Sequence, residues 1–531
     1  MTSHEFDVLI IGAGHNGLVC ACYLAAAGLK VRIVERRAVV GGAAVTEEFV
    51  PGFRNSTASY TVSLLNPKVI GDLRLAERGL RIVERPFSNF VPLPDGRFLK
   101  FGGELAATQA EVAKYSAADA QRLPVYYAQL DRVAAQLKQW VLQAPPNLGG
   151  PFIVQGWRDL MAAARLLWHY GRLPRDGQRD LIDFFTKSAG HWLDSTFESE
   201  PLRAVLGWDS VVGNYASPYA AGSAYVLLHH CFGEVNGKPG KWGHAIGGMG
   251  RITELMADEA RARGVRIDVD AEVAQVLIEG GRTVGLRLAG GEEIRARAVA
   301  ANVNPKLLYQ RLIERSALPE GFATAIDRYR CGSGSFRINV ALAELPDFSC
   351  LTGAQAQPHH ASGIVFAPSL AYMDRAWRDA EAQGFAAAPI VEMLIPSVVD
   401  DTLSPKGAHV ASLFCQQFRP DADWDILKPQ AVEAIFDVVQ SYCPNFRRSL
   451  LGYRALSPLD LEREFGLVGG DIFHGQLSLD QLFSMRPVYG HARYRGPLDG
   501  LYHCGSGAHP GGGVTGAPGH NAALEIIRDL R

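Results

Sequence analysis

The sequence lacks any pair of cysteines at the spacing that redox and zinc sites use. Its 531 residues include eight cysteines, and none of them forms a Cys-x-x-Cys motif. This absence argues against a dithiol redox centre and a structural zinc site. Cys20 and Cys22 lie two positions apart on a predicted helix and therefore point to different faces. We interpret them as small helix residues and the others mostly as buried thiols, which suits a reducing compartment.

Long apolar runs and an excess of charge are also missing. No apolar stretch reaches the length of a membrane-spanning helix. The net charge is −2, so nothing indicates a nucleic-acid partner. Residues 1–6 run directly into a predicted strand and leave no room for a targeting leader, which favours a cytoplasmic location. A mitochondrial location stays open for a eukaryotic relative.

Size and composition predict a globular protein with more than one domain. A chain of 531 residues is too long for one ordinary core. Apolar residues make up 47% and charged residues 20% of it, a balance typical of globular proteins in water.

Residues 6–35 carry the most informative motif. An apolar strand at 7–11 leads into Gly12-Ala13-Gly14-His15-Asn16-Gly17, a helix at 18–27 and a strand at 31–34 that ends at Glu35. This order of strand, Gly-x-Gly-x-x-Gly, helix, strand and acid predicts a dinucleotide-binding fold. Gly12 permits the tight turn, Gly14 lets the backbone approach a pyrophosphate, and Gly17 lets the helix pack on the sheet. We expect the pyrophosphate at the helix N-terminus and a ribose at Glu35.

The residues after Glu35 favour FAD over NAD(P). Arg36, and then the pair Gly41 and Gly42, are typical of FAD enzymes and not of NAD dehydrogenases. Arg36 could instead contact a 2′-phosphate, but Glu35 would repel that group. A further glycine run at 247–250 precedes a helix without a buried strand before it or a suitably placed acid after it. We therefore expect no separate nicotinamide-binding domain.

A second glycine-rich segment lies near the end of the chain. A strand at 501–504 runs into Gly505-Ser506-Gly507 and the stretch 509–519, and a helix at 520–530 follows. So many glycines allow the backbone to contact a flat ligand. The helix N-terminus would face the flavin N1 and C2 carbonyl, where negative charge gathers in the reduced ring. A linker is the alternative, but an apolar helix that closes the chain disfavours it.

The middle of the chain predicts helices at 104–143 and 180–232, and strands at 264–302 that return to the first sheet with a small antiparallel layer. Residues 157–170 form an amphipathic stretch with basic and aromatic residues, which could touch a membrane surface. Because its basic cluster is small, a core helix of a substrate domain is the favoured interpretation. His229 and His230 are adjacent and have no third ligand at metal spacing, so we expect no metal site.

Three motifs together resemble the phytoene desaturase-like FAD-dependent oxidoreductases, a superfamily that includes the amine oxidases. They are GAGHNGLVCACYLAAAG at 12–28, GGMG at 247–250 and CGSGAHPGGGVTGAPGHNAA at 504–523. GGDIFHGQLSLDQLFSMRPVYG at 469–490 is most similar to the branch named for a pyridine nucleotide-disulphide oxidoreductase domain, and next to the carotenoid ketolase branch. The resemblance spans nearly the whole chain. Disulphide reductase activity, which the branch name suggests, would need the adjacent cysteine pair that is missing here.

The resemblance implies an α/β fold with two interleaved domains. The first is a Rossmann-like FAD-binding domain of the glutathione reductase/amine oxidase type, at 1–75, 245–330 and 456–531. The second is a mixed α+β substrate domain at 76–244 and 331–455. With Arg36 and Gly42 from the first motif, the predicted contacts of a noncovalent FAD are Gly12, Gly14, Gly17, Glu35, Arg36, Gly42, Val273, Gly505, Ser506, Val514 and Thr515.

The implied reaction is hydride transfer from a C–H bond of a hydrophobic small molecule, such as a carotenoid or a lipid, to the flavin. His474, Arg486 and His509 are the polar candidates near the reaction, although Arg486 could merely fix a loop and His474 could be a packed histidine. The alternative function is a flavin-containing scaffold or regulatory protein with little turnover. The sequence gives no signal of the oligomeric state.

We further expect residues 478–489 to pass near the flavin ring, because they precede the last strand by only a dozen residues. Leu482, Phe483 and Met485 would line an apolar tunnel, and Arg486 would mark its polar end. Packing between the two domains is the alternative role for these side chains.

Overall fold

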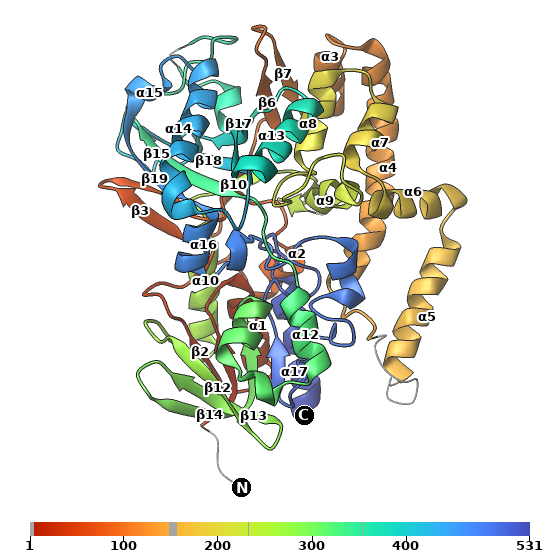
Figure 1. Cartoon of the computed structure of the whole chain (residues 1–531), viewed down its shortest axis with the longest axis vertical. Helices are drawn as coiled ribbons and strands as arrows, with labels where there is room; N and C mark the ends of the chain where they lie inside the picture. The colour runs from red at the N-terminus through yellow and green to blue at the C-terminus, as the bar shows by residue number, and fades with distance from the viewer. Residues whose placement is uncertain (1–4, 148–156, 232, 354) are drawn as a thin grey trace.

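The computed structural model describes residues 5–147, 157–231, 233–353 and 355–531, arranged in two parts that each contain a seven-stranded sheet (Figure 1). Residues 1–4, where the sequence predicts that no leader fits, lie outside these ranges. The first described residues and the C-terminus lie at the end of the molecule that holds the first sheet, whereas the second sheet lies at the opposite end (Figure 1).

The first sheet is built around β1 (Phe6–Ile11), which is parallel to both of its neighbours, β2 (Val31–Val34) and β14 (Glu293–Ala301). The apolar side chains of β1 from Val8 onward are buried, as expected of a central parallel strand. α1 (His15–Ala26) begins within the glycine motif, three residues earlier than predicted. The last glycine of the motif therefore lies inside the first helical turn.

Two later segments of the chain complete this sheet. β11 (Arg266–Asp268) is parallel to β2, and β20 (Leu501–His503) is parallel to β14. β12 (Val273–Glu279) and β13 (Arg282–Leu288) form an antiparallel layer that joins the first residues of β14. The predicted return of residues 264–302 into the first sheet is confirmed.

Helices cover both faces of the first sheet, as a Rossmann-like fold requires. α1 packs against α10 (Met249–Ala262) and α17 (Ala517–Leu530). On the other face, α12 (Glu320–Arg328) buries apolar side chains against β12, β13 and β14. The two glycine-rich segments thus lead into neighbouring helices, which brings the ends of the chain together.

The second sheet has the order β19-β15-β18-β17-β16-β6-β7, and only β16 and β6 within it are parallel. Its strands are β6 (Asn89–Pro92), β7 (Phe98–Phe101), β15 (Phe336–Leu342), β16 (Gly363–Phe366), β17 (Phe385–Leu394), β18 (His409–Phe418) and β19 (Leu450–Leu456). The mixed α/β fold class is confirmed. The predicted domain boundaries stay a prediction.

Helices surround the second sheet. The predicted helical segment at 104–143 is confirmed, and the segment at 180–232 is helical in part, because residues 209–222 form turns and irregular backbone and residue 232 lies outside the described residues. The helices of these two segments are α3 (Leu105–Val112), α4 (Ala117–Val141), α6 (Arg175–Thr186), α7 (Ala189–Thr196), α8 (Glu200–Trp208) and α9 (Ser223–His230). α13 (Leu370–Gln383) and α14 (Trp424–Tyr442) also pack on this sheet. Shorter elements include β3 (Thr46–Val50), β4 (Phe53–Ser56), α2 (Pro67–Asp72), β5 (Ile82–Glu84), β10 (Gly243–Ala245) and α16 (Pro458–Phe465).

The favoured interpretation of residues 157–170 as a core helix is wrong. They form α5 (Trp157–Arg172), which lies at the margin of the molecule beside α4 (Figure 1). Its large apolar side chains Trp157, Leu160, Met161, Leu167 and Trp168 are exposed. An amphipathic pattern fixes which side chains share a face, but it does not determine what that face contacts.

Two further properties concern the described part of the chain as a whole. No helix there is both long enough and apolar enough to cross a membrane. All eight cysteines are free thiols, and five of them are buried, namely Cys20, Cys22, Cys415, Cys443 and Cys504.

Candidate functional site

The N-terminal glycine motif forms a tight turn that opens onto a cavity. Gly12 takes a φ of 94°, which favours glycine. A Cβ at Gly17 would lie 2.3 Å from the carbonyl oxygen of Gly12, so this position also requires glycine. Gly14 is the N-cap of α1 and has no side chain of its own that could cap this helix end. The positive end of the α1 dipole therefore faces the cavity, which Gly12, Gly14 and His15 line.

Asn302, directly after β14, holds this turn from the other side. In the amide orientation that satisfies both its ends, its side-chain oxygen accepts hydrogen bonds from the N–H groups of Gly14 (3.2 Å) and Gly17 (3.3 Å). A Cβ at Gly14 would lie 2.8 Å from the Asn302 amide. Asn302 also lines the cavity. Sequence reasoning missed this role, and the only local signal is a polar residue at the end of a buried strand.

Glu35 lies at the end of β2, buried and on the cavity wall. One carboxylate oxygen accepts a hydrogen bond from the Ala13 N–H (2.8 Å) and the other from the Arg37 N–H (3.0 Å). Each oxygen keeps lone-pair capacity for a ribose hydroxyl. Val273, the predicted adenosine contact, lines the same region of the cavity. The predicted adenosine end is thus assembled from two separate segments.

Arg36 and Gly42 lie beside this end in different ways. Arg36 lines the cavity, but its guanidinium donates to the carbonyl oxygens of Arg463 (3.1 Å) and Glu464 (2.7 Å) at the end of α16. Gly42 takes a φ of 57°, and a Cβ there would approach Gly14 Cα to 3.3 Å. Both residues therefore shape the site around the turn.

The C-terminal glycine-rich segment forms the opposite wall. Of its four predicted flavin contacts, Ser506 and Val514 line the cavity, whereas Gly505 and Thr515 do not. Gly505 instead packs so closely on Asn302 that a Cβ would lie 3.0 Å from its carbonyl carbon. The Thr515 hydroxyl accepts a hydrogen bond from the Ala517 N–H (3.1 Å) at the start of α17. These two residues support the wall from behind.

The two glycine-rich segments are directly joined. The Asn16 side chain donates a hydrogen bond from Nδ2 to the Ser506 hydroxyl at 3.1 Å. Buried polar atoms at this junction have no partner within the described residues, namely His15 Nε2, Asn16 Oδ1 and His474 Nδ1. Burial lowers the pKa of His15 to about 3 and that of His474 to about 4, so both rings are neutral. Unpaired neutral donors and acceptors beside the N-terminus of α1 fit a polar cofactor such as FAD.

One continuous cavity of about 450 Å³ connects these walls to the second part of the molecule. Beyond His474 and Ser506 its lining is largely aromatic and aliphatic, with Leu64, Val212, Trp242, Phe414, Ile472 and Phe473. The adenosine end, the junction of the glycine-rich segments and this apolar end therefore form a single site.

A buried polar network supports the apolar end, and sequence reasoning missed it. The Tyr60 ring stacks on Phe414, with centroids 4.9 Å apart, and the guanidinium of Arg337 lies 4.5 Å from the Tyr60 ring centroid. The Tyr60 hydroxyl donates to Glu392 Oε2 at 2.6 Å, and Arg85 pairs with the same carboxylate at 3.4 Å. Burial raises the pKa of Tyr60, and the charge of Glu392 adds to this. Tyr60 is therefore a neutral phenol on the cavity wall.

The three predicted polar candidates, His474, Arg486 and His509, differ in whether they line the cavity. His474 lines the cavity, but Arg486 and His509 do not. Arg486 is fully buried and donates to the backbone carbonyls of Phe473, Gly475, Gln476, Gln481 and Ser506. His509 contacts the Trp140 carbonyl oxygen through Nε2 at 3.0 Å. The alternative in which Arg486 fixes a loop is the one that the structure supports.

The expected lining by residues 478–489 is wrong. Leu482 is buried in the core, Met485 is partly exposed, and Phe483 lies beside α4 and α5. Residues 472–474 form the cavity wall instead. The Arg486 guanidinium donates hydrogen bonds to the carbonyl oxygens of Phe473 and Ser506, and these bonds hold the loop around Arg486 behind the C-terminal glycine-rich segment.

The glycine run at 247–250 does not form a second nucleotide site. The N–H groups of Met249 and Gly250, at the start of α10, donate to the hydroxyls of Ser56 and Thr46, both at 2.9 Å. The end of this helix is therefore already capped by protein. Among the described residues, no cluster of three or more potential metal ligands occurs. The ring of His230 contacts the Val226 carbonyl oxygen at 2.8 Å within α9.

The family described as flavin containing amine oxidoreductase matches residues 17–336. The chain is 40% identical to pyridine nucleotide-disulfide oxidoreductase domain-containing protein 2 of Rattus norvegicus, an alignment that covers 99% of this chain and 94% of the rat protein. It is 25% identical to the lycopene-forming phytoene desaturase of Pantoea ananas, over 98% of this chain and 99% of that protein. The resemblance predicted from the motifs is confirmed.

Solved structures share the fold at low sequence identity. An oxidoreductase from Methanosarcina mazei aligns with a TM-score of 0.59 and 15% identity, covering 98% of this chain and all of the other. Cyclohexylamine oxidase from Brevibacterium oxydans aligns with a TM-score of 0.57 and 16% identity, covering 99% of both chains.

Proposed function

Since this chain belongs to the flavin containing amine oxidoreductase family and is therefore an FAD-dependent oxidoreductase, we propose that it oxidises a hydrophobic small molecule in the apolar end of its cavity. FAD, when bound, supplies the hydride acceptor, and the protein supplies binding, orientation and a dry environment. The observation that carries the proposal is the lining by Val212, Trp242 and Phe414 on the same cavity that Glu35 and Ser506 line.

Residues at one end of the cavity would bind the cofactor, and residues at the other end would bind the substrate. Glu35 and the α1 N-terminus would hold the ribose and the pyrophosphate, while Ser506 and Val514 would face the flavin. Phe414 and Trp242 would orient an apolar substrate and exclude water from the reacting C–H bond. Tyr60, fixed by Glu392 and stacked on Phe414, would hold the aromatic wall in place. The name of the Pantoea relative, phytoene desaturase, supports an apolar substrate.

The test is anaerobic reduction of the purified holoprotein, measured as the loss of flavin absorbance. Apolar compounds of graded length should reduce the flavin, and extraction with mass spectrometry should identify any apolar molecule that copurifies. Faster reduction by small polar amines would overturn the proposal. A flavin that stays oxidised with every donor, and whose removal abolishes binding of a partner protein, would favour the scaffold function instead.

A pair of variants separates substrate contact from folding. Phe414→Leu should slow flavin reduction by the apolar donor while FAD content stays unchanged. Phe366→Leu is the matched control, because Phe366 is equally buried in the same sheet but does not line the cavity. Equal loss of rate in both variants would contradict a specific role for the cavity wall.

Peripheral contact with a membrane is a separate part of the proposal. An enzyme that takes an apolar substrate benefits from access to a lipid surface, where such molecules concentrate. The exposed apolar side chains of α5 support such contact.

A further inference from the structure

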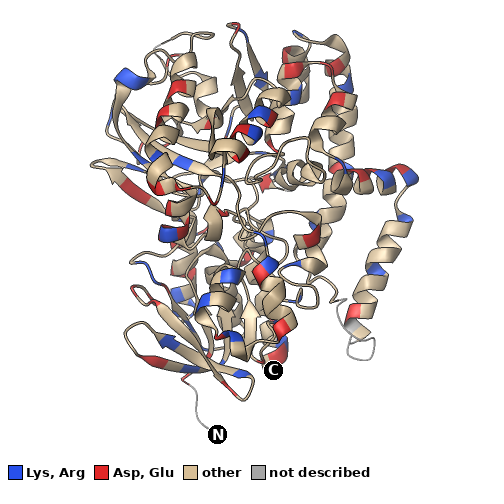
Figure 2. Cartoon of the chain, viewed as in Figure 1, with Lys and Arg blue, Asp and Glu red and all other residues tan. Residues whose placement is uncertain are grey.

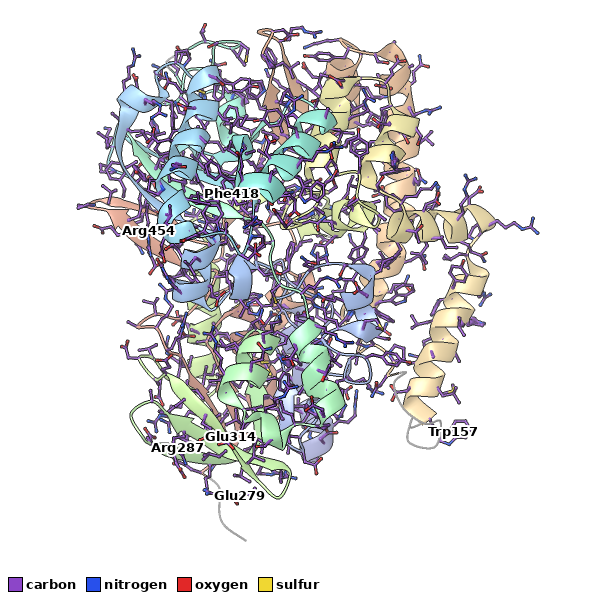
Figure 3. The ribbon with its side chains drawn as sticks, in the orientation of Figure 1. Trp157, Glu279, Arg287, Glu314, Phe418 and Arg454 are labelled. Carbon is purple, nitrogen blue, oxygen red and sulfur yellow. The ribbon has the colours of Figure 1, made fainter. Side chains whose placement is uncertain are left out.

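α5 presents a continuous apolar stripe to solvent. The exposed fractions are 80% for Trp157, 45% for Leu160, 55% for Met161, 72% for Leu167 and 55% for Trp168. With Ala164 these residues recur at helical spacing and share one face of α5. Figure 3 shows Trp157 at the end of α5, away from the body of the molecule. A soluble protein rarely leaves such a patch uncovered unless it binds something.

The opposite face of α5 is the one that packs on the protein. Ala162, Arg165, Leu166 and His169 line a small cavity together with Trp140 and Phe483. Near the start of the helix, Asp159 pairs with Arg493 at 2.8 Å and accepts a hydrogen bond from the Asn147 N–H at 2.9 Å. The helix is thus docked through its own inner face, and this docking turns the apolar stripe outward.

The charges beside the stripe are mainly positive. Arg165 and Arg172 on α5, and Arg175 on α6, are exposed and make no ion pair within the described residues. The guanidinium of Arg172 lies 4.4 Å from the Trp168 ring centroid, at the edge of the stripe. Most acids of the two helices are already paired, in Asp159–Arg493, Asp180–Arg132 and Asp183–Lys187. Figure 2 shows both basic and acidic residues along α5 and α6.

We propose that α5 docks this protein onto an anionic membrane surface, with its apolar stripe at the boundary between headgroups and acyl chains. Tryptophans at two positions of the stripe suit this boundary, since an indole has an apolar body and a polar N–H. Arg172 at the edge of the stripe, together with the exposed Arg165 and Arg175 nearby in the sequence, complements anionic headgroups. A single helix at the margin of the molecule also presents a convex surface. Such a surface can insert into a lipid interface more easily than it can pack against a second copy of the chain.

The docking rests on the membrane contact named in the proposed function. Because it concerns a surface outside the cavity, its failure can be distinguished from a failure of the proposed substrate class. The test is flotation of the full-length holoprotein with vesicles of phosphatidylcholine that contain phosphatidylglycerol, compared with phosphatidylcholine alone. We expect the protein to float with the anionic vesicles, and to float less as salt is raised because the arginine attraction is screened.

Two double variants make the test specific. Leu160→Glu/Leu167→Glu should lower partitioning onto anionic vesicles roughly 10-fold or more, with unchanged FAD content and melting temperature. Ile426→Glu/Leu451→Glu is the matched control, because those side chains are 66% and 55% exposed elsewhere on the molecule. Equal partitioning of the two double variants would overturn the proposal. The proposal would also be overturned if the wild-type protein did not bind the vesicles but formed dimers in analytical ultracentrifugation, and if Leu160→Glu/Leu167→Glu abolished those dimers.

Discussion

Arg486 donates two hydrogen bonds to the carbonyl oxygen of Ser506, at 2.9 Å from Nη2 and 3.3 Å from Nε. Ser506 lines the cavity, whereas Arg486 lies behind it with no exposed surface. The same guanidinium donates to the carbonyl oxygen of Phe473 at 2.7 Å, and Phe473 lines the cavity as well. Two stretches of the cavity wall therefore depend on one buried cation that lines no part of the cavity.

Replacing Arg486 by Met should destabilise the protein and loosen FAD binding together. The change leaves several buried carbonyl groups without a donor, and each such loss costs about 1–3 kcal/mol. We expect a lower free energy of unfolding, by about 3 kcal/mol or more, and flavin release at a lower temperature. Arg330→Met is the control, because Arg330 pairs with Asp480 on the surface nearby. Equal flavin release in both variants would contradict the role of Arg486.

Replacing Glu35 by Ala should weaken FAD binding by about 1.5–3 kcal/mol, through loss of charge-assisted hydrogen bonds to the ribose. Part of this loss comes from the protein, since the Ala13 N–H loses its acceptor. Glu35→Gln keeps a neutral acceptor and should lie between the wild type and Glu35→Ala. Titration of the apoprotein with FAD measures the dissociation constants. Three equal constants would show that the ribose is held elsewhere.

NADH and NADPH should reduce the flavin poorly. Gly14 and His15 at the α1 N-terminus line the cavity, whereas the first N–H groups of α10 donate to Ser56 and Thr46 and leave no second anion site there. Stopped-flow mixing under anaerobic conditions should show slow bleaching that does not saturate with nucleotide concentration. Dithionite is the control, because it reduces accessible flavin without a binding site. Saturable bleaching within milliseconds would overturn this expectation.

Local features of the sequence predicted the nucleotide fold, and long-range contacts decided the rest. The motif from Gly12 to Glu35 is readable because its strand, turn and helix are set by neighbouring residues. The pair Tyr60–Glu392 joins residues 332 positions apart, so no local spacing reveals it. The sequence marks Arg486 as a polar candidate near the flavin, but its carbonyl partners depend on the path of the loop in three dimensions. The exposure of Trp157 likewise depends on which face of α5 the rest of the protein covers.

Buried histidines should make the protein acid-sensitive below pH 6.5. His503 is the clearest case, because neither ring nitrogen has a hydrogen-bond partner within the described residues. Burial lowers its pKa to about 3, with smaller effects from His474 and Arg486. In the unfolded chain His503 takes up a proton near pH 6.5, whereas in the folded protein it stays neutral until about pH 3. Its contribution is therefore fully present above pH 6.5 and is lost as the pH falls below that value.

The expected loss is about 1.4 kcal/mol per histidine for each pH unit between pH 6.5 and the folded-state pKa. Melting temperatures of the apoprotein at one scan rate, from pH 7.5 down to about pH 5, follow this loss. His503→Phe removes one of the protons that the chain takes up on unfolding, and a phenyl ring suits the contact with Tyr309. The variant should therefore melt with a shallower dependence on pH. Phe322→Leu changes the same apolar surroundings of Tyr309 without removing a titratable group, so it is the control and should keep the wild-type slope. Parallel curves for wild type and His503→Phe would show that His503 is already protonated in the folded protein.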